Sequence, residues 1–316
     1  MIVAAGSALS AVLLSVTAPP LLRGMMTSFA PRVVAAAWLT CIGAVVFFTC
    51  FAVVVLAWPG HAPALGAVEA TMQCLTSLLH AAPQWFAHPF TALAVLAALA
   101  ATTRVAVIMR RHLRRRARIQ DYHRDVIAVV ARCTDDVVPV MWLDHSMPMA
   151  YSVDGRPGMV VATEGLARSL TEMQRRAVLA HEHAHLRGHH HRAIRICEVM
   201  AAALPWIPLF AAAPRAVTTL AELAADESAA RDTSAAAIHA ALRSVSQSRS
   251  TDSPSALRGF GDEVITMRLR RLESLPSNAP RESSALAVLL LPPILALAVA
   301  ALGVLAAGGI ACLLSS

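Results

Sequence analysis

Lysine is absent from this chain of 316 residues, so all 27 basic side chains are arginines. Charged residues are scarce as well: they make up 15% of the sequence, against 57% hydrophobic residues, and the mean hydropathy is +0.58. Soluble domains carry about 25% charged residues, so this composition argues against an ordinary soluble protein. The six cysteines have no paired spacing, so neither a disulfide framework nor a cysteine-ligated zinc site is indicated. The composition predicts an integral membrane protein.

Four apolar runs are long enough to cross a bilayer as helices, which takes about 20 residues. They predict an N-terminal membrane domain over residues 1–109 and a C-terminal transmembrane helix over residues 285–316. The runs themselves cover residues 2–22, 33–58, 90–109 and 285–314. A cleaved signal peptide is the alternative for the first run. No basic segment precedes that run, which favours a membrane span.

The arginines are distributed unevenly among the connections between these runs. Arg23 and Arg32 lie in the first connection, residues 59–89 contain no arginine, and residues 110–116 contain a cluster directly after the third run. Basic residues accumulate on the cytoplasmic side of membranes. We therefore expect a multi-pass protein of the cell membrane, with its N-terminus outside and residues 110–284 in the cytoplasm.

The basic cluster and the net charge of +7 could also indicate a nucleic-acid partner. However, a basic cluster directly after a span is typical of an anchor that contacts anionic lipid. No aromatic residues alternate with these arginines, and no DNA-binding motif accompanies them. We therefore expect the lipid bilayer as a partner and no direct binding of nucleic acid.

His181, Glu182 and His185 form an HExxH motif. Two histidines four positions apart lie on one face of a helix, so both imidazoles can bind one Zn²⁺. The glutamate between them then points at the open position of the ion and can act as general base. The motif therefore predicts a zinc hydrolase with Glu182 as its catalytic residue.

Local signals predict the elements around the motif. Thr171 and Gln174 form a capping box at the start of a helix predicted over residues 170–187. Residues 153–161 predict a hairpin, a pair of strands joined by a turn, that precedes this helix. In zincins, a strand beside the metal-site helix pairs with an extended substrate, and an ordinary edge strand is the alternative here.

A third ligand must come from elsewhere in the chain. Glu222 and Asp226 are again four positions apart, so they share one face of a downstream helix. One carboxylate can bind the zinc ion while the other holds the free N–H of a ligand imidazole. We predict Glu222 as the ligand and Asp226 as the orienting residue. A solvated helix carboxylate is the alternative for Glu222.

These residues resemble the BlaR/MecR-type membrane metallopeptidases, gluzincins of metallopeptidase family fifty-six, with the HtpX-type proteases as cousins. That pattern is HExxH followed by a helix with E-x-x-[A/C]-D, which His181, Glu182, His185, Glu222 and Asp226 match. The resemblance implies a mainly α membrane protein with four transmembrane helices. In such a fold, an α+β gluzincin (zincin-like) cytoplasmic domain, here residues 110–284, is inserted between spans three and four.

Three segments of the predicted cytoplasmic domain need separate interpretation. A membrane span over the uncharged residues 199–213 would place His185 and Glu222 on opposite sides of the bilayer, so we expect a buried or re-entrant helical segment. The histidines at 189–191 predict a solvated helix end, with a second metal site as the alternative. Residues 244–254 predict a flexible connector, and the resemblance makes them a candidate for self-cleavage.

The functional hypothesis is a membrane metalloendopeptidase that depends on Zn²⁺. The resemblance implies a cytosolic protein substrate, a winged-helix transcriptional repressor of the BlaI type, cut in response to a membrane signal, an antibiotic or envelope stress. The first alternative is an HtpX-like protease for quality control of membrane proteins. The second is a non-catalytic zinc-binding sensor, which the presence of Glu182 argues against. Assembly into a homo-oligomer stays open.

Overall fold

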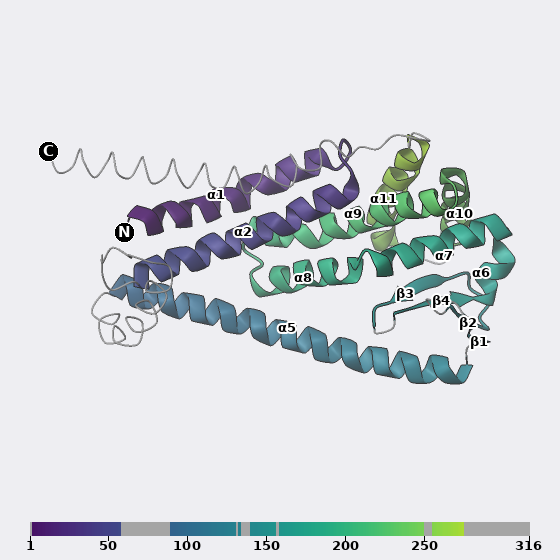
Figure 1. The fold of residues 1–316 in the computed structure, drawn as a ribbon, viewed down its shortest axis with the longest axis horizontal. Helices are drawn as coiled ribbons and strands as arrows, with labels where there is room; N and C mark the ends of the chain where they lie inside the picture. Colours follow the sequence, from purple (N-terminus) through teal and green to yellow (C-terminus); the bar gives the residue numbers. More distant parts are fainter. Residues whose placement is uncertain are drawn as a thin grey trace, which may run out of the picture.

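The computed structural model describes residues 2–57, 89–130, 132–133, 140–155, 158–249 and 255–274 (Figure 1). Its elements are mostly helices, with one small sheet near the helix that carries the HExxH motif. The predicted fourth span and the C-terminal domain over residues 285–316 lie outside the described residues. Of the predicted flexible connector, residues 250–254 lie outside them too. Residues 244–249 form the last turns of a helix, α10 (Ala235–Arg249), so the prediction of a flexible segment was wrong for them.

In the part of the chain that the structure describes, three helices are long and apolar enough to cross a membrane: α1 (Ile2–Met25), α2 (Pro31–Ala57) and α5 (Pro89–Val130). They match the first three predicted runs. Several large apolar side chains on these helices are exposed, namely Leu9, Phe47, Leu93, Leu96 and Leu99. An apolar surface of this kind is unfavourable in water and suits contact with lipid. The arrangement therefore indicates insertion into a membrane.

Helix α5 is longer than its apolar part. The stretch suited to a bilayer covers Ala92–Arg115, and the helix continues to Val130 as one piece of 42 residues. At 1.5 Å per residue it is about 63 Å long. The predicted third span and the arginine cluster over residues 110–116 therefore lie on a single helix, which leads directly from the apolar part to the sheet.

The sheet has the strand order β1-β2-β4-β3, with β1 (Arg132–Cys133), β2 (Val140–Leu143), β3 (Ala150–Val153) and β4 (Met159–Thr163). β3 and β4 pair antiparallel, which confirms the predicted strand pair. β4 also pairs in parallel with β2, and its residues Val160, Val161 and Ala162 are fully buried. With β1 at the other side, β3 is therefore one of the two edge strands of this sheet among the described residues.

The helices that follow the sheet are α6 (Glu164–Ser169), α7 (Glu172–Arg187), α8 (His190–Ala203), α9 (Pro208–Asp232), α10 (Ala235–Arg249) and α11 (Ser255–Glu273). The predicted capping box of α7 is confirmed. The backbone N–H of Thr171 donates to Gln174 Oε1 at 2.9 Å, and the backbone N–H of Gln174 donates to Thr171 Oγ1 at 3.4 Å. This box defines where the HExxH helix begins, and β3 packs against that helix.

Residues 199–213 fold as the tip of a helical hairpin. Helix α8 ends at Ala203, a turn follows, and Pro208 occupies the first turn of α9, where a helix tolerates proline. Both helices pack beside the apolar helices (Figure 1), and Phe210 of α9 shares a buried core with Trp38 of α2. Because the chain reverses direction here, α9 returns to α7.

Candidate metal centre

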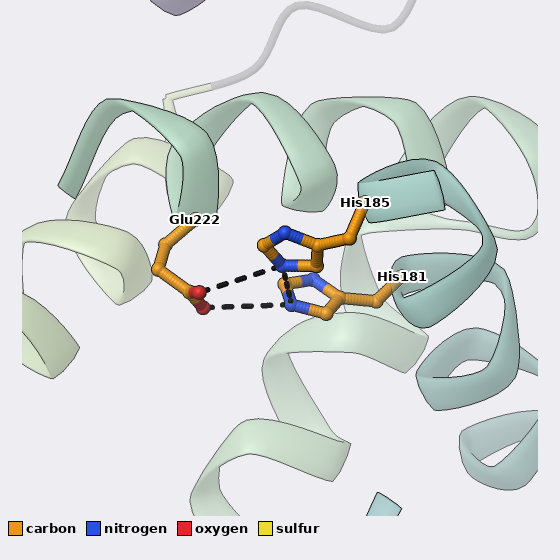
Figure 2. A group of neighbouring side chains, drawn as sticks. All are labelled: His181, His185 and Glu222. Carbon is orange, nitrogen blue, oxygen red and sulfur yellow. Dashed lines mark hydrogen bonds and ion pairs between the residues drawn. The ribbon is translucent and has the colours of Figure 1, made fainter. Parts of the chain in front are cut away.

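Helix α7 presents both motif histidines to one point (Figure 2). His181 and His185 lie one helical turn apart, and they are 8% and 6% exposed. Their Nε2 atoms are 3.1 Å apart. A single metal ion can therefore take both nitrogens as ligands, as the motif predicts.

Glu222 reaches the same point from α9. Its Oε2 lies 3.5 Å from Nε2 of His181, and its Oε1 lies 3.4 Å from Nε2 of His185. Two ligand atoms that are each about 2.1 Å from a tetrahedral zinc ion lie about 3.4 Å apart. All three separations fit such an ion. The three predicted ligands are thus brought together, and among the described residues they form the one group suited to a metal.

Asp226 contacts His181 on the side away from the other ligands. Its Oδ1 lies 2.9 Å from Nδ1 of His181, which is where a carboxylate orients a ligand imidazole. Asp226 is 2% exposed and accepts two hydrogen bonds from the guanidinium of Arg268, at 2.7 and 2.8 Å. A bidentate pair of this kind is strong and directional. This geometry agrees with the prediction that Asp226 contacts the imidazole of one of the two histidines.

Arg268 of α11 is a site residue that the sequence did not reveal. One of its terminal nitrogens also lies 3.0 Å from Oε2 of Glu222, so a single guanidinium holds both of the site carboxylates that α9 contributes, Glu222 and Asp226. Its side chain is only 14% exposed. The sequence signal is one arginine between two apolar residues of a helix, which is too common a pattern to mark a functional position.

The charges of this cluster attract a cation. Burial raises the pKa of Glu222, but the hydrogen bond with His181 and the charge of Arg268 outweigh burial and hold that pKa well below its usual range. Burial lowers the pKa of His181, whereas hydrogen bonds with Asp226 and Glu222 raise it, with a final value of about 9. Burial lowers the pKa of His185 to about 3, so this imidazole is neutral at pH 7. Ionised carboxylates beside a neutral imidazole suit a divalent cation.

His190 is buried, so the prediction of a solvated helix end over residues 189–191 was wrong. It is 8% exposed, and its Nδ1 lies 3.1 Å from Nδ1 of His185. At this distance it can fix the orientation of the ligand imidazole. The physical reason is His189, whose left-handed backbone (φ 51°) turns the chain and folds the start of α8 onto α7.

Gly188 leaves the space that His190 occupies. A methyl group at this position would lie 2.4 Å from Nε2 of His190, although the backbone there is helical and would otherwise accept alanine. We expect Gly188→Ala to displace His190 and to weaken zinc binding about 10- to 100-fold, the usual effect of losing an outer contact to a ligand. Competition with a chelator of known affinity measures this change.

The double variant identifies the cause of that loss. Once His190→Ala has removed the ring, the new methyl group meets no imidazole, so Gly188→Ala should not weaken zinc binding further in this background. If Gly188→Ala weakens zinc binding by the same factor in the wild-type protein and in the His190→Ala background, Gly188 acts through the end of α7 and not through His190.

Glu182 lines the same pocket as the ligands. Burial raises the pKa of its carboxyl, against the opposing effects of His181 and of hydrogen bonds from Ser152 on β3. The hydroxyl of Ser152 lies 3.0 Å from Nε2 of half-buried His191. A raised pKa suits a general base. Ser152 and His191 thus hold the carboxylate in place from the side of the sheet.

The pocket has a volume of about 360 Å³. Its lining combines the metal-site residues and Arg268 with apolar side chains, namely Leu166, Val178, Ile238, Leu242 and Val245. Edge strand β3 runs along the pocket, where an extended peptide could add to the sheet through backbone hydrogen bonds. The arrangement suits a peptide that places one apolar side chain beside the metal site.

Comparison with known proteins agrees with this geometry. Residues 113–255 match the family model described as Peptidase family M48. This family includes HtpX-type membrane zinc proteases, and the match indicates a metallopeptidase, an activity that depends on a metal in this family. The matched range contains the three predicted ligands and Asp226 but ends before Arg268. No curated protein and no solved structure matches the chain.

Proposed function

We propose that this chain is an integral-membrane zinc metalloendopeptidase, built from a membrane domain over residues 1–109, a peptidase domain over 110–284 and a last span over 285–316. The observation that carries the proposal is the spacing of two imidazole nitrogens and one carboxylate around a single point. The base Glu182 lines the same open pocket. Its presence argues against a sensor that only binds zinc.

Each residue of the site has a role in hydrolysis. His181, His185 and Glu222 hold the zinc ion, which when bound acts as a Lewis acid on the scissile carbonyl and on water. Glu182 takes the proton of the attacking water and passes it to the leaving amine. Asp226 keeps the ring of His181 oriented.

The peptidase domain is proposed to face the cytoplasm, close to the bilayer. The arginine cluster after the third apolar run supports this orientation. Trp206 at the tip of the α8–α9 hairpin is 67% exposed, and the guanidinium of Arg104 on α5 lies 5.7 Å from its ring. Tryptophan and arginine are both suited to the level of the headgroups. On this basis, residues 199–213 enter the cytoplasmic leaflet as a re-entrant segment.

The proposed substrate is a cytosolic transcriptional repressor of the winged-helix, BlaI type, cut when the membrane part changes state. The choice of a repressor comes from the resemblance to BlaR/MecR-type peptidases. The test follows the level of such a repressor, encoded beside this gene, under cell-envelope stress. We expect stress to remove the repressor from wild-type cells and to leave it intact in cells that lack this gene. Equal loss in both strains would contradict the proposal.

Quality control of membrane proteins is the second candidate function. The match to a family that includes HtpX-type proteases favours it. The same pair of strains separates the two candidates. A repressor that persists in both strains, together with misfolded membrane proteins that accumulate only in the strain without this gene, would support the second candidate over the first.

A further inference from the structure

Helix α11 carries a second buried arginine one turn after Arg268. The side chain of Arg271 is 10% exposed, and its guanidinium donates three hydrogen bonds to two separate parts of the chain. Nε donates to Oε1 of Glu227 on α9 at 2.8 Å. The terminal nitrogens donate to the backbone carbonyls of Met26 and Phe29, at 3.1 and 2.9 Å.

Met26 and Phe29 belong to the short connection between α1 and α2. Met26 directly follows α1, and a carbonyl group at the end of a helix has no partner within the helix, so a positive charge there is favourable. Phe29 lies nearer to the start of α2, so its carbonyl contributes only a hydrogen bond. Arg271 supplies both the hydrogen bonds and the charge from a position more than 240 residues away in the sequence. The planar guanidinium fixes the direction of all three bonds, so the two carbonyls and Glu227 are held in one geometry.

Helices α9 and α11, which Arg271 and Glu227 join, also meet at the metal centre. Glu227 follows Asp226 directly on α9, and Arg268 precedes Arg271 by one turn on α11. Arg268 holds Asp226, which contacts the ligand His181. A continuous series of charged hydrogen bonds and helix backbone therefore joins the connection between α1 and α2 to the metal ligands.

We propose that Arg271 is a positioning residue that couples the α1–α2 connection to the metal centre. The inference rests on the proposed function, because it assigns a role in controlling that same site. When α1 and α2 move relative to each other, the carbonyls of Met26 and Phe29 move too. Arg271 then either shifts with them or releases one partner, and α11 carries that displacement to Arg268. The state of the membrane helices thereby sets the geometry of Asp226 and Glu222.

The test measures metal binding by the full-length protein, in lipid and with no substrate present. We expect Arg271→Gln to weaken zinc binding about 3- to 30-fold, the range of coupling between linked sites. It should also shift the visible absorption bands of the Co²⁺-substituted protein, which report ligand geometry. Arg270→Gln is the matched control, because Arg270 is the exposed neighbour on the same helix. Wild-type affinity and spectrum in Arg271→Gln would overturn the coupling.

A double-mutant cycle tests the coupling itself. Two glycines inserted between Thr27 and Ser28, both exposed, displace the connection. The insertion should weaken zinc binding in the wild-type and Arg270→Gln backgrounds but have no further effect in Arg271→Gln. An equal loss in all three backgrounds would mean that the insertion only disturbs folding, and would overturn the coupling.

The proposed function can fail separately, in a cleavage assay on the same preparation of the protein. If the wild-type protein binds zinc but cuts no protein, the peptidase proposal fails while the affinities still test the coupling. If the wild-type protein binds no metal, both proposals fall.

Discussion

Glu182→Gln should retain its zinc and lose at least about 100-fold in the rate of peptide hydrolysis. The substitution keeps the size of the side chain and the hydrogen bonds to Ser152, but an amide cannot take a proton from water. None of the three ligand atoms changes, so the metal should stay bound. The measurement compares cleavage rates and zinc content of the purified full-length protein in lipid.

Glu172→Gln is the matched control for this variant. Glu172 lies on the same helix as Glu182, but in its exposed first turn, where it pairs with Arg175 and Arg176. Exposed pairs of this kind contribute about 0–1 kcal/mol, so this variant should hydrolyse peptides at the wild-type rate. A Glu182→Gln protein that retains wild-type activity would show that another group supplies the base, and the assigned mechanism would fail.

The parts of this molecule that could be predicted depend on short-range periodicity. The i, i+4 spacing of His181 and His185, and of Glu222 and Asp226, gives each pair a common helix face in any fold. The capping box at Thr171 involves residues three positions apart. The apolar helices could be predicted as well, because a long uncharged apolar run is visible in the sequence itself. These features need no knowledge of which helix packs against which.

The parts that could not be predicted depend on contacts between distant segments. Arg268 reaches the site because α11 packs beside α9, and nothing near it in the sequence records that packing. His190 becomes buried only through the left-handed turn at His189, a conformation that is uncommon for any residue except glycine. The hairpin at residues 199–213 depends on the apolar helices beside it.

These distant contacts also determine the charge of the site. Glu182, Glu222 and Asp226 bring three carboxylates to one pocket, and among the described residues Arg268 is the arginine that pairs with two of them, Glu222 and Asp226. A metal ligand imidazole is neutral, so His181, whose pKa of about 9 keeps it protonated at pH 7, gives up its proton when a metal binds. With both histidines neutral, the three carboxylates and Arg268 leave a net charge of about −2. Such a charge is unfavourable in a half-closed pocket unless a cation balances it. A single zinc ion would balance this charge even with Arg268 beside Glu222.

Glu222→Gln should therefore lose zinc while the domain stays folded. The amide still fills the space and still accepts a hydrogen bond from Arg268, whose bidentate pair with Asp226 is unchanged. However, the site loses both an anionic ligand and half of its net charge. Zinc binding should therefore weaken by more than the roughly 10- to 100-fold that follows the loss of a residue contacting a ligand. The exposed Glu263→Gln, whose partner Arg215 also lies on α9, should keep about one zinc per chain. Metal analysis of the purified variants measures both. Full zinc content in Glu222→Gln would leave the two histidines without their assigned third ligand and would refute this metal centre.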